Sequence, residues 1–257
     1  MNLILPEIFN SKYKSNSQIA RVITETWLKN EMYCPACGCN FLTKNPNNAK
    51  MADFFCSECG EIYELKSTSH KIGKTIIDGA YSAAIERITS NKNLNLFILH
   101  YNKNIIENFI LTPKYFFTPD IIKVRNPLSK TAQRAGYVGC NILFDEIPQE
   151  GKINVVKSKL EEDKKIVIEK YSQSLKLKTE NINSRTWLID IIKCVGKITH
   201  EIFTLKEMYT FTPELAKKHQ DNHNIEAKIR QQLQFLIKKG FIERIENGVY
   251  RKKFYGE

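Results

Sequence analysis

The sequence predicts a mixed α/β domain followed by a smaller α+β domain. In the first part of the chain, stretches with the two-residue alternation of strands follow stretches with the 3.6-residue periodicity of helices. The second part instead places three helical stretches before one hairpin. Two matched pairs of cysteines lie in the first part and predict a metal site there. We therefore expect two domains, residues 1–182 and 183–257.

Composition indicates a folded protein and is compatible with a polyanionic partner. Apolar residues make up 42% of the 257 residues and charged residues 26%, as in ordinary globular chains. The net charge of +11 favours phosphate binding, although a lysine-rich composition alone can produce it. No stretch approaches the roughly 20 apolar residues of a membrane span, and no export signal is visible, so we expect no membrane partner. Seven cysteines, an odd number, fit the reducing cytoplasm.

The first domain is predicted to begin with an amphipathic helix. Apolar residues such as Val22 and Trp27 recur at helical spacing between residues 15 and 30. Strands over residues 53–55 and 62–66 follow, joined by a short loop that carries cysteines. A helix over residues 77–90 and strands over 94–101 and 109–111 complete the expected α/β core.

The second domain has the order of a winged helix. The chain is dense in charge over residues 157–170 and polar over 179–184, where we place the linker region. Helices are predicted over residues 185–195, from 204 onward and over 225–239. Asn247-Gly248, the strongest short hairpin signal, then joins two strands. In a winged helix the third helix enters the major groove of DNA and the hairpin contacts its backbone.

The four cysteines in two C-x2-C-G motifs predict a structural zinc site. The pairs are Cys34 with Cys37 and Cys56 with Cys59, and 18 residues separate them. Four thiolates complete a closed tetrahedral shell around Zn²⁺. Either pair alone could be a redox dithiol, but two matched pairs favour zinc. A deaminase is excluded because the sequence has no H-x-E element upstream of the cysteines.

Three cysteines lie outside these motifs: Cys39, Cys140 and Cys194. We interpret them as buried or surface thiols, and Cys39 is also a minor candidate for an alternative metal ligand.

Asp53, Glu64 and Lys66 form a D-x10-E-x-K pattern that predicts a catalytic site. Glu64 and Lys66 are two apart in a strand and so point to the same face. A hairpin closed at the second cysteine pair would bring Asp53 beside Glu64, and two carboxylates can hold Mg²⁺. Such an ion activates water for phosphodiester hydrolysis, while Lys66 orients that water or stabilises developing charge. The bare pattern also occurs by chance, as a solvated pair on an exposed strand.

The third C-terminal helix and the hairpin carry the residues expected to contact DNA. Residues 181–257 contain 14 Lys and Arg against 9 Asp and Glu, a net charge of +5. Side chains of types that pair with base edges or phosphates are Lys228, Arg230, Gln231, Gln232, Gln234, Arg251, Lys252 and Lys253. A winged helix used for protein contacts is the alternative, because this charge excess is modest.

Short runs spread over both domains are the most specific feature of the chain. They are residues 13–18 (YKSNSQ), 52–54 (ADF), 64–66 (ELK), 78–81 (DGAY), 134–137 (RAGY), 140–141 (CN) and 228–234 (KIRQQLQ). In sequence and in order they resemble the DpnI-like type IIM restriction endonucleases of the PD-(D/E)xK superfamily.

This resemblance implies a Mg²⁺-dependent enzyme that cuts double-stranded DNA at GATC when the adenine carries an N6-methyl group. It also implies a zinc-bearing PD-(D/E)xK domain and a winged helix that both sense methylated DNA. By match, Asp53, Glu64 and Lys66 take the catalytic positions, and the four cysteines take the zinc positions. One residue departs from the family's RAGW segment, since this chain has Tyr137 in place of tryptophan. If that segment lines a methyl pocket, the preference for methylated DNA is altered.

Two alternatives to this function stay open at the level of sequence. One is a non-enzymatic DNA-binding regulator with a zinc ribbon and a winged helix. The other is a nuclease of different methyl specificity. For the leading hypothesis we expect a cytoplasmic monomer.

Overall fold

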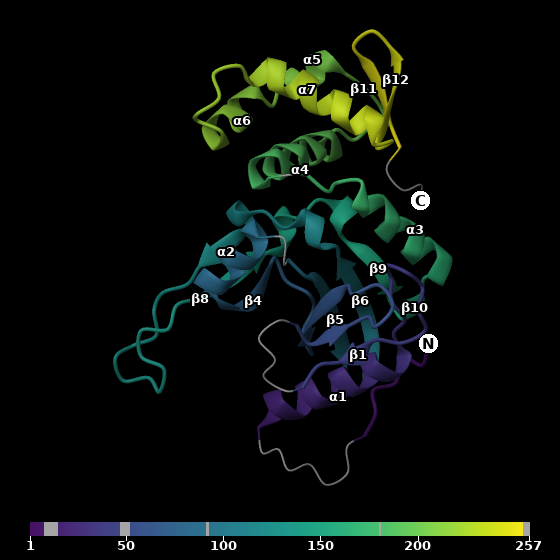
Figure 1. The fold of residues 1–257 in the computed structure, drawn as a ribbon, viewed down its shortest axis with the longest axis vertical. Helices are drawn as coiled ribbons and strands as arrows, with labels where there is room; N and C mark the ends of the chain where they lie inside the picture. The colour runs from purple at the N-terminus through teal and green to yellow at the C-terminus, as the bar shows by residue number, and fades with distance from the viewer. Residues whose placement is uncertain (8–14, 47–51, 91–92, 180, 254–257) are drawn as a thin grey trace. The chain divides into compact units, whose positions relative to one another are not determined.

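The computed structural model describes residues 1–7, 15–46, 52–90, 93–179 and 181–253. It divides into two compact units (Figure 1). The first unit comprises Met1–Ile147 and Gly151–Ser174, and the second comprises Pro148–Glu150 and Leu175–Glu257. Among the described residues, no helix combines the length and the apolar character that crossing a membrane requires.

A seven-stranded mixed sheet forms the centre of the first unit, in the order β1-β2-β3-β5-β6-β9-β10. Strand β3 runs parallel to β5, and the other described neighbours in this sheet are antiparallel. Residues 96–99 of β5 are all buried, as a continuous apolar run requires when both faces of a strand are covered. The strands are β1 (Thr43–Lys44), β2 (Phe54–Phe55), β3 (Ile62–Thr68), β5 (Asn95–Asn102), β6 (Ile105–Thr112), β9 (Ile153–Lys157) and β10 (Leu160–Glu161).

Helix α1 (Asn16–Glu31) packs along this sheet (Figure 1) and confirms the predicted first helix. Ser15 caps its N-terminus, where the hydroxyl accepts a hydrogen bond from the Gln18 amide. Trp27 packs edge-on against Phe109 of β6, with ring centroids 5.3 Å apart. Phe109 points to one face of the sheet, and Glu64 and Lys66 point to the other. Helix α1 therefore covers the face that does not carry Glu64 and Lys66.

A second sheet, of order β4-β8-β7, corrects the predicted helix over residues 77–90. Helix α2 is Tyr81–Thr89, and the residues before it form β4 (Thr75–Ala80). Strand β4 is antiparallel to β8 (Gly139–Leu143), so the partner that makes it a strand lies some 60 residues further along the chain. Local periodicity cannot reveal such a partner. The correction moves Asp78 from a predicted helix to a strand, opposite Cys140.

The remaining elements of the first part of the chain are short, apart from α3. Helix α3 (Lys164–Leu175) occupies part of the charged segment that we assigned to the linker region, which is a second correction. Its Val167 and Tyr171 are fully buried in the core, so the lysines and glutamates around them are simply its exposed face. The others are η1 (Lys114–Phe116), η2 (Pro119–Ile121), β7 (Ile122–Val124), η3 (Phe144–Glu146) and η4 (Gln149–Gly151).

The second unit has the predicted winged-helix order, with two differences. The predicted second helix is two short helices, because Pro213 begins a new first turn in α6. A third strand, β11, pairs with the hairpin in the order β11-β13-β12. Gly248, at a φ of 75°, makes the predicted Asn-Gly turn. The elements are α4 (Ile182–Lys197), β11 (Ile202–Thr204), α5 (Leu205–Tyr209), α6 (Thr212–Lys218), α7 (Ile225–Lys238), β12 (Ile242–Glu246) and β13 (Val249–Lys252).

Candidate active site, zinc site and DNA-binding helix

The four predicted zinc ligands lie together. Their sulfur atoms are all within 4.8 Å of one another, and the Cys34–Cys59 and Cys37–Cys56 pairs are 3.6 Å apart. A tetrahedron of thiolates around Zn²⁺ has S–S edges of about 3.8 Å when the Zn–S bonds are about 2.3 Å. The donor set and its spacing therefore fit a structural zinc ion.

Each cysteine pair sits in a tight turn that aims backbone amides inward. Gly38 and Gly60, at φ of 78° and 74°, close the two turns through amide hydrogen bonds to the carbonyls of Cys34 and Cys56. Although burial raises the pKa of Cys56, the amides of Cys59 and Glu58 outweigh it and lower that pKa to about 7. Burial raises the pKa of Cys59 in the same turn and of Cys34 in the other turn, so a bound metal ion would have to stabilise the thiolate form of these two ligands.

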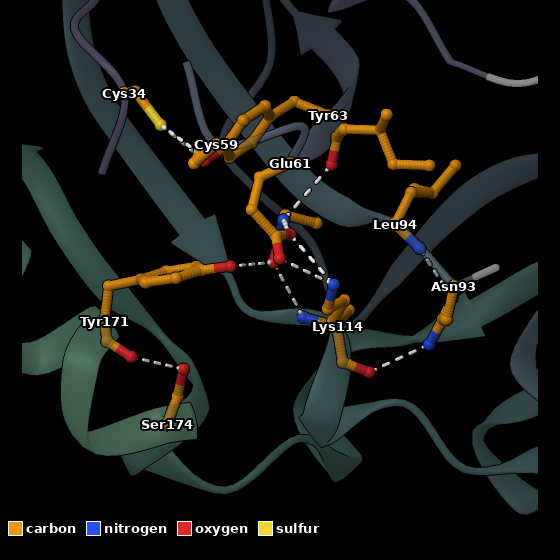
Figure 2. Close-up of polar contacts among 11 residues, drawn as sticks. Cys34, Cys59, Glu61, Tyr63, Asn93, Leu94, Lys114, Tyr171 and Ser174 are labelled. Carbon is orange, nitrogen blue, oxygen red and sulfur yellow. Dashed lines mark hydrogen bonds and ion pairs between the residues drawn. The ribbon is translucent and has the colours of Figure 1, made fainter. Parts of the chain in front are cut away.

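Polar contacts tie the zinc turns to the sheet (Figure 2). The Tyr63 hydroxyl lies 3.2 Å from the Cys34 sulfur, and Tyr63 is the residue before Glu64 in β3. Glu61 accepts hydrogen bonds from Lys114 at 2.7 Å and from Asn95 of β5 at 2.9 Å. The start of β3 is therefore fixed both by the cysteine cluster and by its parallel neighbour.

The other three cysteines are separate from this cluster. Cys140 and Cys194 are buried, and Cys39 is half-exposed. Among the residues described, the cysteine group suited to a metal comprises the four predicted ligands and not Cys39.

The structure brings Asp53, which directly precedes β2, close to the segment of β3 that carries Glu64 and Lys66. Phe54 is opposite Tyr63, and the Asp53 amide donates a hydrogen bond to the Tyr63 carbonyl at 3.1 Å. The Asp53 carboxylate accepts a hydrogen bond from the Leu65 amide at 2.8 Å. The Lys66 ammonium is 2.5 Å from Glu64. The predicted antiparallel pair of strands is thus present in the fold.

Two further residues, which the sequence did not reveal, complete this cluster. Asp78 of β4 lies 2.9 Å from the Lys66 ammonium. Arg87 of α2 contacts both Glu64, at 3.0 Å, and Asp78, at 3.2 Å. Asp78 belongs to the DGAY run, which carries part of the family resemblance. Nothing in the spacing of Asp78 or Arg87 along the sequence indicates that they lie near the hairpin.

Burial and charge act against each other on these groups. Burial disfavours the charge on Lys66, but Glu64 and Asp78 outweigh it and raise the pKa of Lys66, which therefore stays protonated. Burial also raises the pKa of Asp78, but Lys66 outweighs it and lowers that pKa overall. The charged form of Asp78 thus stabilises the folded protein above the ordinary aspartate pKa, and this stabilisation is lost as the pH falls through the lowered pKa of the folded state. Burial raises the pKa of Asp53, assisted by the neighbouring charge of Glu25.

Most of the side chains predicted to contact DNA from α7 lie on its surface. Arg230, Gln231 and Gln234 are exposed, and Lys228 is partly exposed. Gln232 is a correction, because its side chain is only 3% exposed. It follows Ile229 by three residues and precedes Leu236 by four, which places it on the buried stripe of the helix. As the structure stands, Gln232 is not available to a base.

The basic residues of the hairpin are partly neutralised within the second unit. Arg251 pairs with Glu243 at 2.6 Å and with Glu201 at 3.4 Å, and Lys253 also pairs with Glu243. Lys252 donates a hydrogen bond to the Ile198 carbonyl. The hairpin is therefore less basic in effect than its sequence indicates.

Tyr137 lies in the segment between β7 and β8. This segment extends away from the second sheet (Figure 1). The guanidinium of Arg134 sits 4.1 Å from the centre of the Tyr137 ring, and Tyr137 is partly exposed. Tyr137 lies three residues before Cys140, the strand partner of Asp78.

A strand pair beside a four-cysteine cluster that could hold zinc, a D-x10-E-x-K pattern and a helix-turn-helix unit are together typical of a DNA-acting nuclease. Comparison with protein families agrees. The model of the DpnI, or Dam-replacing, family matches residues 1–180, and the model of the Dam-replacing HTH domain (DpnI_C) matches residues 183–252. The chain belongs to the DpnI (Dam-replacing) family and is a DpnI-like, methylation-dependent restriction endonuclease.

Two adjacent glutamines of α7 offer a matched test of the DNA-binding face. We expect Gln231→Ala to weaken binding to the cognate duplex by about 1–3 kcal/mol and to leave folding unchanged, because the side chain is exposed. Gln232→Ala should instead lower the free energy of unfolding, because it empties a buried position. Fluorescence anisotropy and denaturant titration measure the two effects. The assignment of Gln231 as exposed to DNA and Gln232 as buried would be contradicted if both variants lost DNA affinity equally and neither lost stability.

Proposed function

We propose that this protein hydrolyses double-stranded DNA at GATC sites whose adenines carry an N6-methyl group, in a Mg²⁺-dependent reaction. The observation that carries the proposal is the hydrogen bond from the Leu65 amide to the Asp53 carboxylate, since Leu65 lies between Glu64 and Lys66, whose side chains are 2.5 Å apart. We further propose that residues 1–182 form the catalytic domain and 183–257 the DNA-binding domain. The protein would act as a cytoplasmic monomer.

Asp53 and Glu64 would hold the magnesium ion. Both are carboxylates, the hard oxygen donors that Mg²⁺ prefers; Asp53 directly precedes β2, and Glu64 lies on its antiparallel partner β3. The raised pKa of Asp53 indicates a carboxylate whose charge a cation would stabilise. When bound, the ion supplies charge neutralisation at the phosphate and lowers the pKa of a water.

Lys66 would stabilise the negative charge that develops on the phosphoryl oxygens. Since Glu64 and Asp78 raise its pKa, its side chain is a hydrogen-bond donor at neutral pH and a poor proton acceptor. This favours charge stabilisation, or orientation of water by donation, over general-base catalysis by Lys66.

Zinc would have a structural role, because the four cysteines fill a closed tetrahedral shell. The residues of α7 that would contact base edges are Lys228, Arg230, Gln231 and Gln234. The residues of the hairpin that would contact phosphates are Arg251, Lys252 and Lys253. Gln232 is left out of this set because it is buried.

Cleavage of two matched plasmids tests the proposal. One is fully methylated at the adenines of its GATC sites, the other is unmethylated, and both are incubated with Mg²⁺ and either the wild-type protein or Asp53→Ala. We expect the wild type to cut only the methylated plasmid and Asp53→Ala to cut neither. Cutting of both plasmids would reject the GATC-methyl requirement. Binding without any cutting by the wild type would favour the non-enzymatic regulator.

A nuclease with a weaker methyl preference is the second candidate, and Tyr137 is the observation that favours it. If Tyr137 contacts the methylated base, Tyr137→Ala removes an aromatic contact of about 1–3 kcal/mol. The ratio of cleavage rates on methylated and unmethylated DNA should then fall by roughly tenfold or more. Tyr137→Trp, which keeps an aromatic face for Arg134, should preserve or increase that ratio. Unchanged ratios in both variants would remove Tyr137 from the methyl-sensing role.

A further inference from the structure

Lys66, Glu64, Arg87 and Asp78 form a closed ring of ion pairs, in which each cation contacts both carboxylates. Lys66 is 2.5 Å from one oxygen of Glu64 and 2.9 Å from one oxygen of Asp78. Arg87 is 3.0 Å from the other oxygen of Glu64 and 3.2 Å from the other oxygen of Asp78. Two positive and two negative charges thus compensate one another.

The ring draws on three separate elements. Glu64 and Lys66 come from β3, Asp78 from β4 and Arg87 from the last turn of α2. Asp78 is the most buried member, with a side chain 5% exposed, and Glu64 is 15% exposed. The second sheet and α2 therefore place a fixed carboxylate and a forked cation at the catalytic hairpin.

This arrangement conflicts with simple metal binding at Glu64. Both of its oxygens already contact a cation, whereas the nearby Asp53 accepts only a backbone amide among the hydrogen bonds of the described residues. A divalent cation between Asp53 and Glu64 would also be repelled by two positive groups a few ångströms away. Metal binding at Glu64 therefore requires that Lys66 and Arg87 loosen their hold on it.

We propose that Asp78 and Arg87 are positioning residues that set the metal affinity of the active site. Arg87 forms an ion pair with Glu64 until a divalent cation displaces its guanidinium. When Glu64 turns to the metal, Asp78 keeps its ion pairs with Arg87 and Lys66. Asp78 thereby keeps the Lys66 ammonium at the reacting phosphate. This inference rests on the assignment of Glu64 as a metal ligand in the proposed function.

The two residues should affect metal affinity in opposite directions. Without Arg87, Glu64 loses a competitor and binds the cation more tightly. Without the charge of Asp78, both cations can turn only to Glu64, so the divalent cation binds more weakly. Arg87→Lys separates competition from a general field effect, because lysine keeps the charge but has a single nitrogen in place of the two that Arg87 gives separately to Glu64 and Asp78.

Calorimetric titration of the zinc-loaded full-length protein with Mn²⁺, without DNA, measures this affinity. The variants are Arg87→Gln, Arg87→Lys and Asp78→Asn, with Arg244→Gln of the second unit as the matched control and Glu64→Gln as the ligand control. We expect Arg87→Gln to bind roughly tenfold more tightly and Arg87→Lys severalfold more tightly. Asp78→Asn should bind roughly tenfold more weakly. Arg244→Gln should match the wild type.

Single-turnover cleavage at saturating Mg²⁺ supplies the second readout. Asp78→Asn should remain slower than the wild type by roughly tenfold, since Lys66 has lost its anchor. The proposal is overturned if both Arg87 variants bind Mn²⁺ no more tightly than the wild type, or if Asp78→Asn keeps both wild-type affinity and wild-type rate. If Glu64→Gln leaves Mn²⁺ affinity unchanged, Glu64 is not a metal ligand and the proposed function itself fails. If Glu64→Gln binds Mn²⁺ more weakly while both Arg87 variants bind it as the wild type does, only the role of Arg87 fails.

Discussion

Replacement of Lys66 by methionine is expected to lower the rate of DNA cleavage by roughly a hundredfold to a thousandfold. The ammonium group is kept charged by Glu64 at 2.5 Å and Asp78 at 2.9 Å, and Asp78 would still hold it in place when Glu64 turns to the metal. A preorganised donor of this kind stabilises charge in the transition state without a cost of reorganisation. Methionine has a similar length but donates no hydrogen bond. Single-turnover cleavage of methylated plasmid measures the effect.

The same substitution leaves two partly buried carboxylates with Arg87 as their shared partner, so some loss of stability is also expected. Removal of one partner from a charged hydrogen-bonded pair costs about 1–3 kcal/mol. Denaturant unfolding should show this loss, and DNA affinity in Ca²⁺ should stay near that of the wild type. Lys103→Met, an exposed lysine in the turn between β5 and β6, serves as the matched control. Wild-type cleavage by Lys66→Met would exclude Lys66 from the reaction.

Removal of one zinc ligand is the second substitution with a large expected effect. Cys56→Ala should abolish zinc retention, lower the free energy of unfolding by at least about 3 kcal/mol and abolish cleavage. The reason is geometric. Cys56 directly follows β2, and the Tyr63 hydroxyl contacts the Cys34 sulfur, so the cluster fixes the strand pair that carries Asp53 and Glu64. Without zinc, three remaining thiols no longer hold this register.

Metal analysis, thermal unfolding and plasmid cleavage on the same preparations test this expectation. Cys39→Ser is the matched control, because Cys39 lies in the first cysteine turn but outside the cluster. It should retain about one zinc ion per chain and normal cleavage. A Cys56→Ala protein that lacks zinc yet cleaves normally would show that the metal does not brace the catalytic hairpin.

Local patterns predicted the first helix, the strand pair at the cysteines and the final hairpin. Each is set by neighbours in sequence: Ser15 caps α1, the glycines close the cysteine turns and Asn247-Gly248 closes the wing. The boundary between β4 and α2 was wrong because β4 is a strand only by pairing with β8. The charged segment around α3 was likewise taken for linker because its buried residues, Val167 and Tyr171, are few among lysines and glutamates.

The sequence by itself determined the chemistry that the chain can carry. Residue type and spacing suffice to place four cysteines in two turns and to put Glu64 and Lys66 on one face of a strand, because turns and strands have fixed local geometry. Only the tertiary structure decided what surrounds that chemistry. Asp78 and Arg87 reach Lys66 and Glu64 through a second sheet whose strands pair over long sequence separations, and Gln232 is withdrawn from DNA by packing within its own unit. Contacts of this kind depend on which surfaces the folded chain buries together, and no local spacing records them.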